Sequence, residues 1–565
     1  MAYQKQTWRN LPDRTTPITA ARLEHMETQY DEVMGEVVPE LELKATYEYV
    51  DSVAFGGDSG NVKAYGAEGD GVTDDGPALQ LAIDSNPKVF LPEGVYLTNQ
   101  TLRLPSDFQM TGVGIGSSVI LAGPALDNVE NVITNELNNE SYRTEYNRNI
   151  YLADFTVDGN FSNRPGSLNQ PRGWNGRASN IFFSTVEHAT VERVESVRGA
   201  LHNFCIDASA MPTTEGPTFY PPGPSRYVTL RKCVSRDQSA DDGFTTHFSH
   251  DILIEDCVAT HSSASSIYPD KAQNGFEVDD GSYRVTVRGC YAEGHAIGFQ
   301  VKSHGIDYAP VRDTLISDCT AYGCAVGYET SNSGSIAGGP MEGRGSSLIF
   351  ENCRYLSPVE IPGPTNNKLF AMRLMTSQNV IVRNFTSRDS PYGGIIVSAG
   401  SVTIDGVRGE RVWTAPDCDT QGFIRFVGDY PGGGVVRDVE VTNIVSGPII
   451  WQSATGGDVD LRVSGIKARG AASFPCVSDS YINQNRTYED IKSQLFSAPI
   501  DIRGGGGANR TIEQYGPFTI MGGGSPNSAI VGKPGWICTI NTSAGTHMWV
   551  KDHTTGNTGW ISLGV

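Results

Sequence analysis

The sequence lacks several features that would define a membrane, secreted or metal-dependent protein. No stretch approaches the roughly 18 consecutive apolar residues of a membrane span, and the N-terminal MAYQKQTWRNLPDR has no apolar core of a signal peptide. Only ten of the 565 residues are cysteines, and no CxxC pair supplies zinc ligands or a redox centre. These absences predict a protein made in a cytosol, without disulfides and without membrane insertion.

Basic residues are also scarce. The chain has 43 Lys and Arg against 64 Asp and Glu, a formal charge of −21. Such a surface repels nucleic-acid phosphates and anionic lipid. We therefore expect no nucleic-acid partner, whereas neutral glycans, or acidic glycans whose charge a metal ion screens, stay compatible.

What the sequence does contain is a short strand motif that recurs at irregular intervals, each copy alternating apolar and polar residues. The last residue of each motif is apolar, and we expect these residues to form one inward column. The copies end at Phe155, Val194, Cys233, Cys257, Cys290, Cys319, Cys353, Phe385, Val407, Ile444 and Ile466. No helix of a dozen residues separates the copies, which argues against a βαβ sheet. The pattern predicts an all-β fold, a right-handed parallel β-helix over residues 51–480, with its cysteines as buried thiols.

A second strand recurs in the same coils and predicts a face that carries chemistry. Its aromatic residues should stack inward; they are Phe204, Phe244, Phe276, Phe299 and Tyr328. Alternation then turns two columns outward: Cys205, Thr245, Glu277, Gln300 and Glu329 in one, and Asp207, His247, Asp279 and Lys302 in the other. Asp241, Asp242, Asp280 and His304 flank these columns, whereas His250 and His261 fall outside them and are predicted to be surface loop residues.

This cluster suits glycoside hydrolysis, which needs one carboxyl group to donate a proton and another to activate water or attack. Glu277 and Asp279, two residues apart on one strand, are the candidate acid/base pair, and Asp241 and Asp242 the supporting or alternative pair. The candidate substrate-binding residues are His247, Lys302, Asp207, Thr245, Gln300, Asp280 and His304. No cofactor or catalytic metal is expected. A solvated Asp-rich turn, or one that binds structural calcium, is the alternative for the cluster.

The two ends of the chain differ from the repeats. Residues 16–38 predict a helix with an a/d stripe, which favours self-association within an N-terminal segment 1–50. Residues 61–97 predict a strand, a Gly/Asp turn, a helix capped near Asp74 or Asp75 and an extended segment. Gly-rich runs and turn signals after residue 480 predict a small C-terminal β module over 481–565, for trimerisation or receptor binding.

Three stretches resemble known families. NVKAYGAEGDGVTDDGPALQLAID followed by VFLPEGVYL resembles the entry segment of the pectate-lyase-like β-helix superfamily. LPDRTTPITAARLEHMETQ resembles the N-terminal attachment segment of phage tail fibres, and the C-terminal GSPNSAIVGKPGWICTINTSAGTHMWVKDHTTGNTGW resembles a module common in such tail proteins. SADDGFTTHFSHDILIEDC, with NGFEVDDGSYRVTVRGCYAEG and GFQVKSHG, resembles β-helix tail proteins of phages of Gram-positive, particularly actinobacterial, hosts.

The resemblance implies a homotrimeric tail spike of a virion that acts at the host cell surface and attaches to other tail or baseplate proteins through its N-terminus. The expected activity is endo-glycosidic cleavage of host polysaccharide. A polysaccharide lyase with Lys302 or His247 as base, and an adhesin without enzymatic activity, are the two alternatives. Polygalacturonases share the fold, but their Asn-Thr-Asp and Gly-His-Gly elements are missing here.

Overall fold

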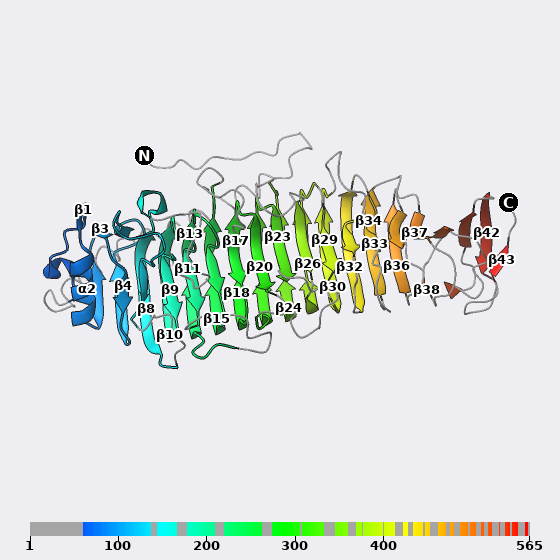
Figure 1. The fold of residues 1–565 in the computed structure, drawn as a ribbon. Helices are drawn as coiled ribbons and strands as arrows, with labels where there is room; N and C mark the ends of the chain where they lie inside the picture. The colour runs from blue at the N-terminus through cyan, green and yellow to red at the C-terminus, as the bar shows by residue number, and fades with distance from the viewer. Residues whose placement is uncertain are drawn as a thin grey trace, which may run out of the picture.

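The computed structural model describes residues 60–136, 144–165, 178–208, 220–262, 274–304, 308–332, 345–359 and 369–375, and shorter stretches between 377 and 562. Parallel strands stack along one long axis from the N-terminal to the C-terminal end (Figure 1). The long parallel sheets are consistent with the predicted right-handed β-helix. The helical segment predicted at 16–38 lies outside the described residues. No helix among the described residues is long and apolar enough to span a membrane.

Each central coil contains three strands, and equivalent strands of successive coils pair in parallel. The first strands are β12 Arg226–Arg231, β15 His250–Glu255, β18 Tyr283–Arg288, β21 Arg312–Ser317, β24 Ser346–Glu351 and β27 Gln378–Arg383. The second are β13 Val234–Arg236, β16 Val258–Thr260, β19 Tyr291–Glu293, β22 Thr320–Tyr322, β25 Arg354–Leu356 and β28 Thr386–Arg388. The third, which form what we call the site sheet, are β9 Ile181–Ser184, β11 Phe204–Asp207, β14 Phe244–Thr246, β17 Asn274–Val278, β20 Ile297–Ser303, β23 Val326–Asn332, β26 Phe370–Met375, β29 Ile395–Ser398 and β31 Ile424–Phe426.

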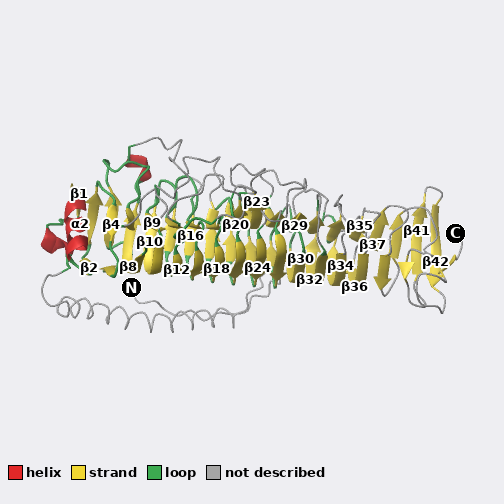
Figure 2. Cartoon of the chain, turned by 60° about the horizontal axis from the view of Figure 1, so that its bottom comes forward, coloured by secondary structure: helices red, strands yellow, loops and turns green. Residues whose placement is uncertain are grey.

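In several coils the first two strands are continuous: β8 Asn147–Asp158, β10 Val186–Val197, β30 Val402–Glu410, β32 Gly434–Ile444, β34 Leu461–Gly470 and β36 Arg486–Gln494. The chain enters the stack through β1 Asp70–Asp74, β2 Lys88–Leu91, β3 Gly94–Thr98, β4 Leu102–Leu104, β5 Phe108–Gly112, β6 Ser118–Ala122 and β7 Ile133–Asn135. Helix α2, Gly76–Ser85, lies at the N-terminal end of the stack (Figure 2).

The start of α2 is where the sequence predicts it. Asp75 is the N-cap residue, and Asp74 accepts a hydrogen bond from the Gly76 backbone N–H at 3.1 Å. The Asp75 carboxylate instead accepts from the backbone N–H groups of Glu68 and Gly69, at 2.7 and 3.0 Å. Both aspartates therefore organise the turn before the helix, and neither needs a metal to explain it.

The inward columns hold the coils together as predicted. Cys233, Cys257, Cys290, Cys319 and Cys353 are buried free thiols. The five aromatic rings of the site sheet stack face to face, with centroids 4.6–5.1 Å apart and planes within 7°. These continuous columns keep successive coils in register, since a slip of one residue would turn a buried side chain outward.

One member of the first column was predicted wrongly. Val439, not Ile444, pairs with Val407 on one side and with Ile466 on the other. The reason lies in the residue that precedes each column residue. Its backbone has the left-handed conformation and turns the chain from the first strand of the coil into the second. That corner is Asp438 here, and elsewhere Lys232, Asp256, Gly289, Asp318, Asn352, Asn384, Gly406 and Gly465. Asp, Asn and Gly adopt this conformation most readily, so the corner residue marks the register.

The parallel ladders also continue past residue 480, the predicted end of the β-helix. The later strands are β33 Ile450–Gln452, β35 Pro475–Asp479, β37 Ala498–Arg503, β38 Arg510–Glu513, β39 Phe518–Met521, β40 Ile530–Val531 and β41 Ile537–Thr542. They pair in parallel from β33 to β41 and from β36 to β40. Antiparallel pairing begins only with β42 Gly545–Lys551 and β43 Trp560–Ser562. The glycine runs at 504–507 and 522–524 interrupt the sequence pattern, but the strands on either side of them pair in parallel.

Candidate functional site

The predicted outward columns exist, and their register is continuous along the site sheet. Cys205 pairs with Thr245, Thr245 with Glu277, Glu277 with Gln300, and Gln300 with Glu329. All five side chains point away from the core, yet all are buried. A solvated turn therefore does not describe this face.

Lys302 lies between the two predicted catalytic carboxylates. Its Nζ is 2.7 Å from Glu277 Oε1 and 3.1 Å from Asp279 Oδ2. Burial raises the pKa of Glu277 and Asp279, but the Lys302 ammonium, with nearby groups, leaves the pKa of both below the ordinary range. Burial likewise lowers the pKa of Lys302, but Asp279 and Glu277 raise it by more. The three groups form a charged triad in which neither carboxylate is a ready proton donor.

Asp242 has the opposite character. It is fully buried beside Glu277. Burial, followed by the charges of Asp241 and Glu277, raises the pKa of Asp242 well above its usual range. Asp242 therefore binds a proton more readily than Glu277 and Asp279, whose pKa values are lowered.

Asp241 and His202 complete this end of the site. His202 Nε2 lies 3.6 Å from Asp241 Oδ2 and 3.7 Å from Asp242 Oδ2, while its Nδ1 lies 3.2 Å from Ser179 Oγ. The Asp241 side chain is 34% exposed, so it reaches solvent where Asp242 does not. His202 lies two residues before β11 of the site sheet, and the structure brings its ring to both aspartates.

His247 connects the triad to the N-terminal side of the cluster. Its Nε2 is 3.7 Å from Asp279 Oδ2 and its Nδ1 is 3.9 Å from Asp207 Oδ2. Burial raises the pKa of Asp207 to about 6, although His247 opposes this rise. The imidazole thus lies between two buried carboxyl groups.

His304 and Asp280 form an ion pair at the C-terminal edge of the cluster, through His304 Nδ1 and Asp280 Oδ2, and the same His304 nitrogen lies 3.7 Å from Asp279 Oδ1. The His304 backbone N–H also donates to Asp280 Oδ1 at 2.7 Å. Burial lowers the pKa of His304, but the hydrogen bond with Asp280 and the charge of Asp279 raise it to about 9. This histidine is therefore cationic at neutral pH.

The remaining predicted residues help to fix the carboxylates. Thr245 Oγ1 donates to Glu277 Oε2 at 3.3 Å. Asn274, which the sequence reasoning did not select, donates to both Glu277 Oε1 and Gln300 Oε1, at 3.1 and 2.8 Å. Gln300 in turn donates to Glu329 Oε1 at 2.9 Å. These bonds give the outward column a continuous polar network.

The predicted surface positions of two other histidines are wrong. His250 lies on β15, is buried, and stacks on Tyr283 with ring centroids 4.6 Å apart. His261 is also buried, with Nε2 3.1 Å from the Gln238 carbonyl oxygen. Both are accounted for by packing outside the carboxylate cluster.

Several described groups have the spacing of metal ligands: Asp279, Asp280 and His304 together, His247 with Glu277 and Asp279, Cys205 with Asp207 and His247, and His202 with Asp241 and Asp242. In the second of these groups the Lys302 ammonium contacts both carboxylates and offsets one of their two negative charges.

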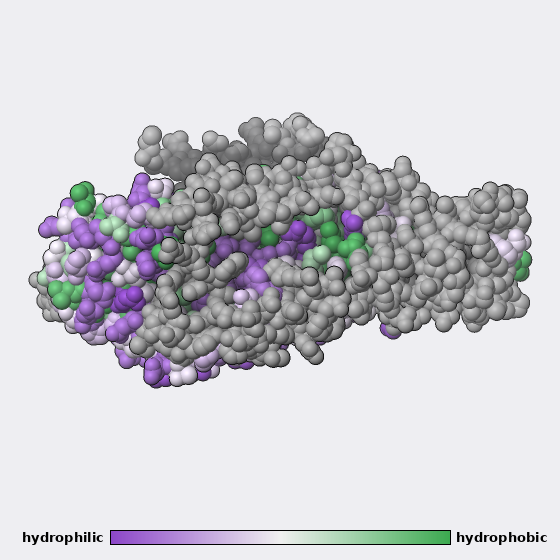
Figure 3. Space-filling model, viewed as in Figure 1, coloured by the Kyte–Doolittle hydropathy of each residue, from purple (hydrophilic) through white to green (hydrophobic). Residues whose placement is uncertain are grey.

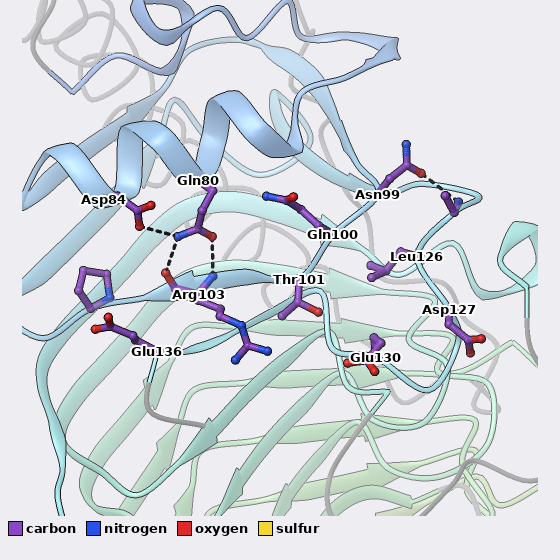
Figure 4. A pocket seen from close by; sticks show the side chains of 12 residues that line it. Gln80, Asp84, Asn99, Gln100, Thr101, Arg103, Leu126, Asp127, Glu130 and Glu136 are labelled. Atoms are coloured by element: carbon purple, nitrogen blue, oxygen red, sulfur yellow. Dashed lines mark hydrogen bonds between the residues drawn. The ribbon is translucent and has the colours of Figure 1, made fainter. Parts of the chain in front are cut away.

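The described residues visible along the middle of this face are mostly hydrophilic over β17 and β20 and become apolar toward β29 (Figure 3). A separate cavity of about 890 Å³ lies beside α2, where Gln80, Asp84, Arg103 and Glu136 are among its lining residues (Figure 4). Gln80 Nε2 donates there to Asp84 Oδ1 and to the Arg103 carbonyl, at 2.8 and 3.0 Å. Arg103 is five register steps from Glu277, so this cavity is distinct from the carboxylate cluster.

Comparison with known proteins relates the chain to two groups. Residues 59–164 match the family described as rhamnogalacturonase A/epimerase, pectate lyase-like. The pre-neck appendage protein of Bacillus phage phi29 is 32% identical over 253 residues, which are 43% of this chain and 27% of that protein. The chain thus spans about a quarter of the length of this phage relative.

The N-terminal fragment of bacteriophage phi29 gene product 12 has a similar fold, with a TM-score of 0.54 and 17% identity over 94% of this chain and all of that one. The mannuronan C5-epimerase AlgE3 of Azotobacter vinelandii is 28% identical over 240 residues, which are 40% of this chain and 11% of that protein. The chain is thus a pectate lyase-like β-helix protein related to phage pre-neck appendage proteins and, more distantly, to polysaccharide-modifying enzymes.

Proposed function

We propose that this protein is a tail spike or appendage of a phage virion that binds host cell-surface polysaccharide and cleaves it as an endo-glycosidase. The relation to phage pre-neck appendage proteins supports a place in the virion. The relation to a mannuronan epimerase supports a polysaccharide ligand. A rigid stack of coils that presents a row of polar side chains along one face suits a long polymer.

The observation that carries the catalytic part of the proposal is the contrast between Asp242 and the Lys302 triad. Glycosidases need one protonated and one ionised carboxyl group near the scissile bond. Asp242 is buried with a raised pKa, whereas Glu277 and Asp279 are ionised beside Lys302. Two carboxyl environments whose pKa values are pushed apart are what acid and base roles require.

In the proposed mechanism the Asp241–Asp242 pair supplies the proton. Asp242 stores it in a buried position, and Asp241, which reaches solvent, contacts the glycosidic oxygen. The ionised Glu277 and Asp279 stabilise the positive charge that develops on the sugar ring, and one of them accepts a proton from the water whose oxygen bonds to the anomeric carbon as the glycosidic C–O bond breaks. This assignment reverses the roles expected from sequence, in which Glu277 and Asp279 were the acid/base pair.

A lyase is the second candidate, and the likeness to alginate lyase 7 of Azotobacter vinelandii favours it, at 27% identity over 211 residues. The Lys302 ammonium is an unsuitable base, because two buried carboxylates hold its proton. In a lyase, His247 would therefore abstract the proton from the sugar. The triad beside it would then orient a uronic acid.

Attachment and assembly follow from the same proposal. We propose a homotrimer that attaches to other tail or baseplate proteins through segment 1–50, with the antiparallel strands β42 and β43 contributing to trimerisation or receptor binding. The host is proposed to be Gram-positive and actinobacterial. Light scattering with cross-linking tests the trimer, and adsorption of fluorescent protein to a panel of cells tests the host.

The decisive experiment is digestion of purified envelope polysaccharide from cells that bind the protein, followed by product mass and ultraviolet absorbance. Wild type is compared with Asp242→Asn, Glu277→Gln and Asp279→Asn. Asp438→Asn is the matched control, because Asp438 lies exposed at a corner position where Asn also occurs. General acid catalysis contributes about 10²- to 10⁴-fold, so Asp242→Asn should lose that much activity.

The product identifies the reaction. Shorter chains of hydrated mass support the hydrolase, and they should disappear in a folded Asp242→Asn variant. Unsaturated, absorbing products support the lyase, and then His247→Ala should be the inactive variant. If wild type and all variants bind the polymer but none of them cleaves it, enzymatic cleavage is contradicted and the protein acts as an adhesin.

A further inference from the structure

The outward column of the site sheet continues beyond the carboxylate cluster and changes its charge. Glu329 of β23 pairs with Arg373 of β26, Arg373 with Ile396 of β29, and Ile396 with Arg425 of β31. The neighbours of these residues within each strand point inward and are fully buried, so Arg373, Ile396 and Arg425 face the same side as Glu277. Two guanidinium groups thus follow the acidic coils on one face.

Arg373 is held in place by the polar network that begins at the site. Gln300 donates to Glu329, and Glu329 forms an ion pair with Arg373 through the Arg373 Nη2. The Arg373 side chain is 18% exposed, and its Nε is buried without a hydrogen-bond partner among the described residues. The guanidinium is therefore oriented by one buried carboxylate, and because the side chain is partly exposed, a ligand can reach it.

The described outward side chains of β26, β29 and β31 include no carboxylate. Besides the two arginines they are Met375, Ile396 and Ser398, all half-buried. The apolar colour at this end of the face in Figure 3 agrees with that composition. A formal charge of −21 describes the whole chain, whereas these three coils present cations on an apolar background.

The spacing suits a polymer that lies along the stack. At a strand separation of about 4.8 Å, Arg373 is three coils or about 14 Å from Glu277, and Arg425 is about 10 Å further. A guanidinium binds a carboxylate or a phosphate through two parallel hydrogen bonds, which a neutral hydroxyl cannot replace. Half-buried Met375 and Ile396 offer apolar contact to the faces of sugar rings between the anions.

We infer that Arg373 and Arg425, with Ile396 between them, form a subsite for acidic units of a glycan whose next units extend into the Asp241–Lys302 cluster. This inference rests on the proposed function for the identity of the polymer and deepens it by naming an anionic substrate. The acidic group is a uronate carboxylate or a backbone phosphate, which have the same bonding chemistry at a guanidinium. The acidic coils then face the bond to be cleaved, and the basic coils bind its flanking anions.

The test measures equilibrium binding of purified envelope polysaccharide to the full chain by calorimetry, in an Asp242→Asn background that prevents turnover. Arg425→Gln and Arg373→Gln are compared with Arg388→Gln, an exposed arginine of β28 on another sheet. Because a hydrogen bond to a charged group contributes about 1.5–3 kcal/mol, each site variant should bind about ten- to hundredfold more weakly. Arg388→Gln should bind like the parent protein.

Chemically modified polymers identify the anion. Carboxyl-reduced polysaccharide should bind the parent as weakly as the variants bind native polymer if the anion is a uronate, and polymer freed of phosphate should do so if it is a phosphodiester. Arg373→Lys separates a folding effect from lost recognition, since it keeps the charge near Glu329 but loses the two-pronged geometry. Unchanged affinity of Arg425→Gln and Arg373→Lys for native polymer overturns the inference, whether or not wild type cleaves it. If wild type does not cleave the polymer but Arg425→Gln and Arg373→Lys still bind it more weakly, only the proposed reaction is contradicted.

Discussion

Replacement of Lys302 by methionine tests how the site is held together. Lys302→Met keeps the length of the side chain but removes the only ammonium within 3.1 Å of Glu277 and Asp279 among the described residues. Both carboxylates are buried, so they would be left as uncompensated charges. Breaking a buried ion pair by removing one partner costs about 3–5 kcal/mol. Lys302 is 17% exposed, so we expect the lower end of this range at pH 7.5.

The free energy of unfolding that is lost in Lys302→Met should depend on pH, and the pKa shifts give the direction. In wild type the pKa of both carboxylates is lowered, so their contribution to stability is present above about pH 4 and is lost as pH falls through the folded-state values. In Lys302→Met burial raises these pKa values instead, and the folded variant takes up protons. The difference in stability between variant and wild type should therefore shrink from pH 8 to pH 5.

Urea unfolding followed by tryptophan fluorescence at pH 5, 6, 7 and 8 measures this difference. Lys88→Met is the control, because Lys88 is exposed on β2 and should change stability by less than about 0.5 kcal/mol. A loss that is the same at every pH, or below about 1 kcal/mol at pH 7.5, would refute the charged triad as the organiser of the site.

Three further predictions concern the coils around the site. Phe276→Ala opens a cavity between Phe244 and Phe299, whose ring centroids lie 4.8 and 4.9 Å from that of Phe276. The free energy of unfolding in urea should fall by about 3–5 kcal/mol. Phe276→Leu should lower it by less. Gly289→Val should lower the free energy of unfolding by about 1–3 kcal/mol, because φ of Gly289 is +64°. Gly289→Asn should be better tolerated, since Asn occupies the same corner in other coils. Equal losses of stability in the two variants would contradict this account. The pKa of His304, raised to about 9, predicts that the contribution of this histidine to stability is complete below pH 6.5 and is lost as pH rises through 9. The pKa of Asp280, raised to about 7, adds a loss of stability between about pH 4 and 7. His304→Gln should flatten the decline in melting temperature above pH 6.5, and an unchanged slope there would exclude the pair with Asp280 as its source.

Much of the fold could be predicted from the sequence because period-two alternation and repeated apolar columns allow few arrangements. The cysteine and aromatic columns specified which residues stack, and alternation then assigned Glu277, Asp279, Lys302 and His247 to one face. The exception, Ile444 in place of Val439, arose because the corner residue rather than hydrophobicity fixes the register. The Asp and Asn residues at equivalent corners were visible in the sequence, but their significance was not recognised.

The tertiary structure alone decided which of these groups are buried and which contact one another. Asp241 and Asp242 are adjacent in sequence, yet one reaches solvent and the other is fully enclosed, so their chemistry differs. Alternation also cannot reveal that Lys302 bridges Glu277 and Asp279, or that Arg373 pairs with Glu329 in the preceding coil. Side-chain direction is a local property of a strand, whereas burial and proton affinity depend on neighbours that distant parts of the chain supply.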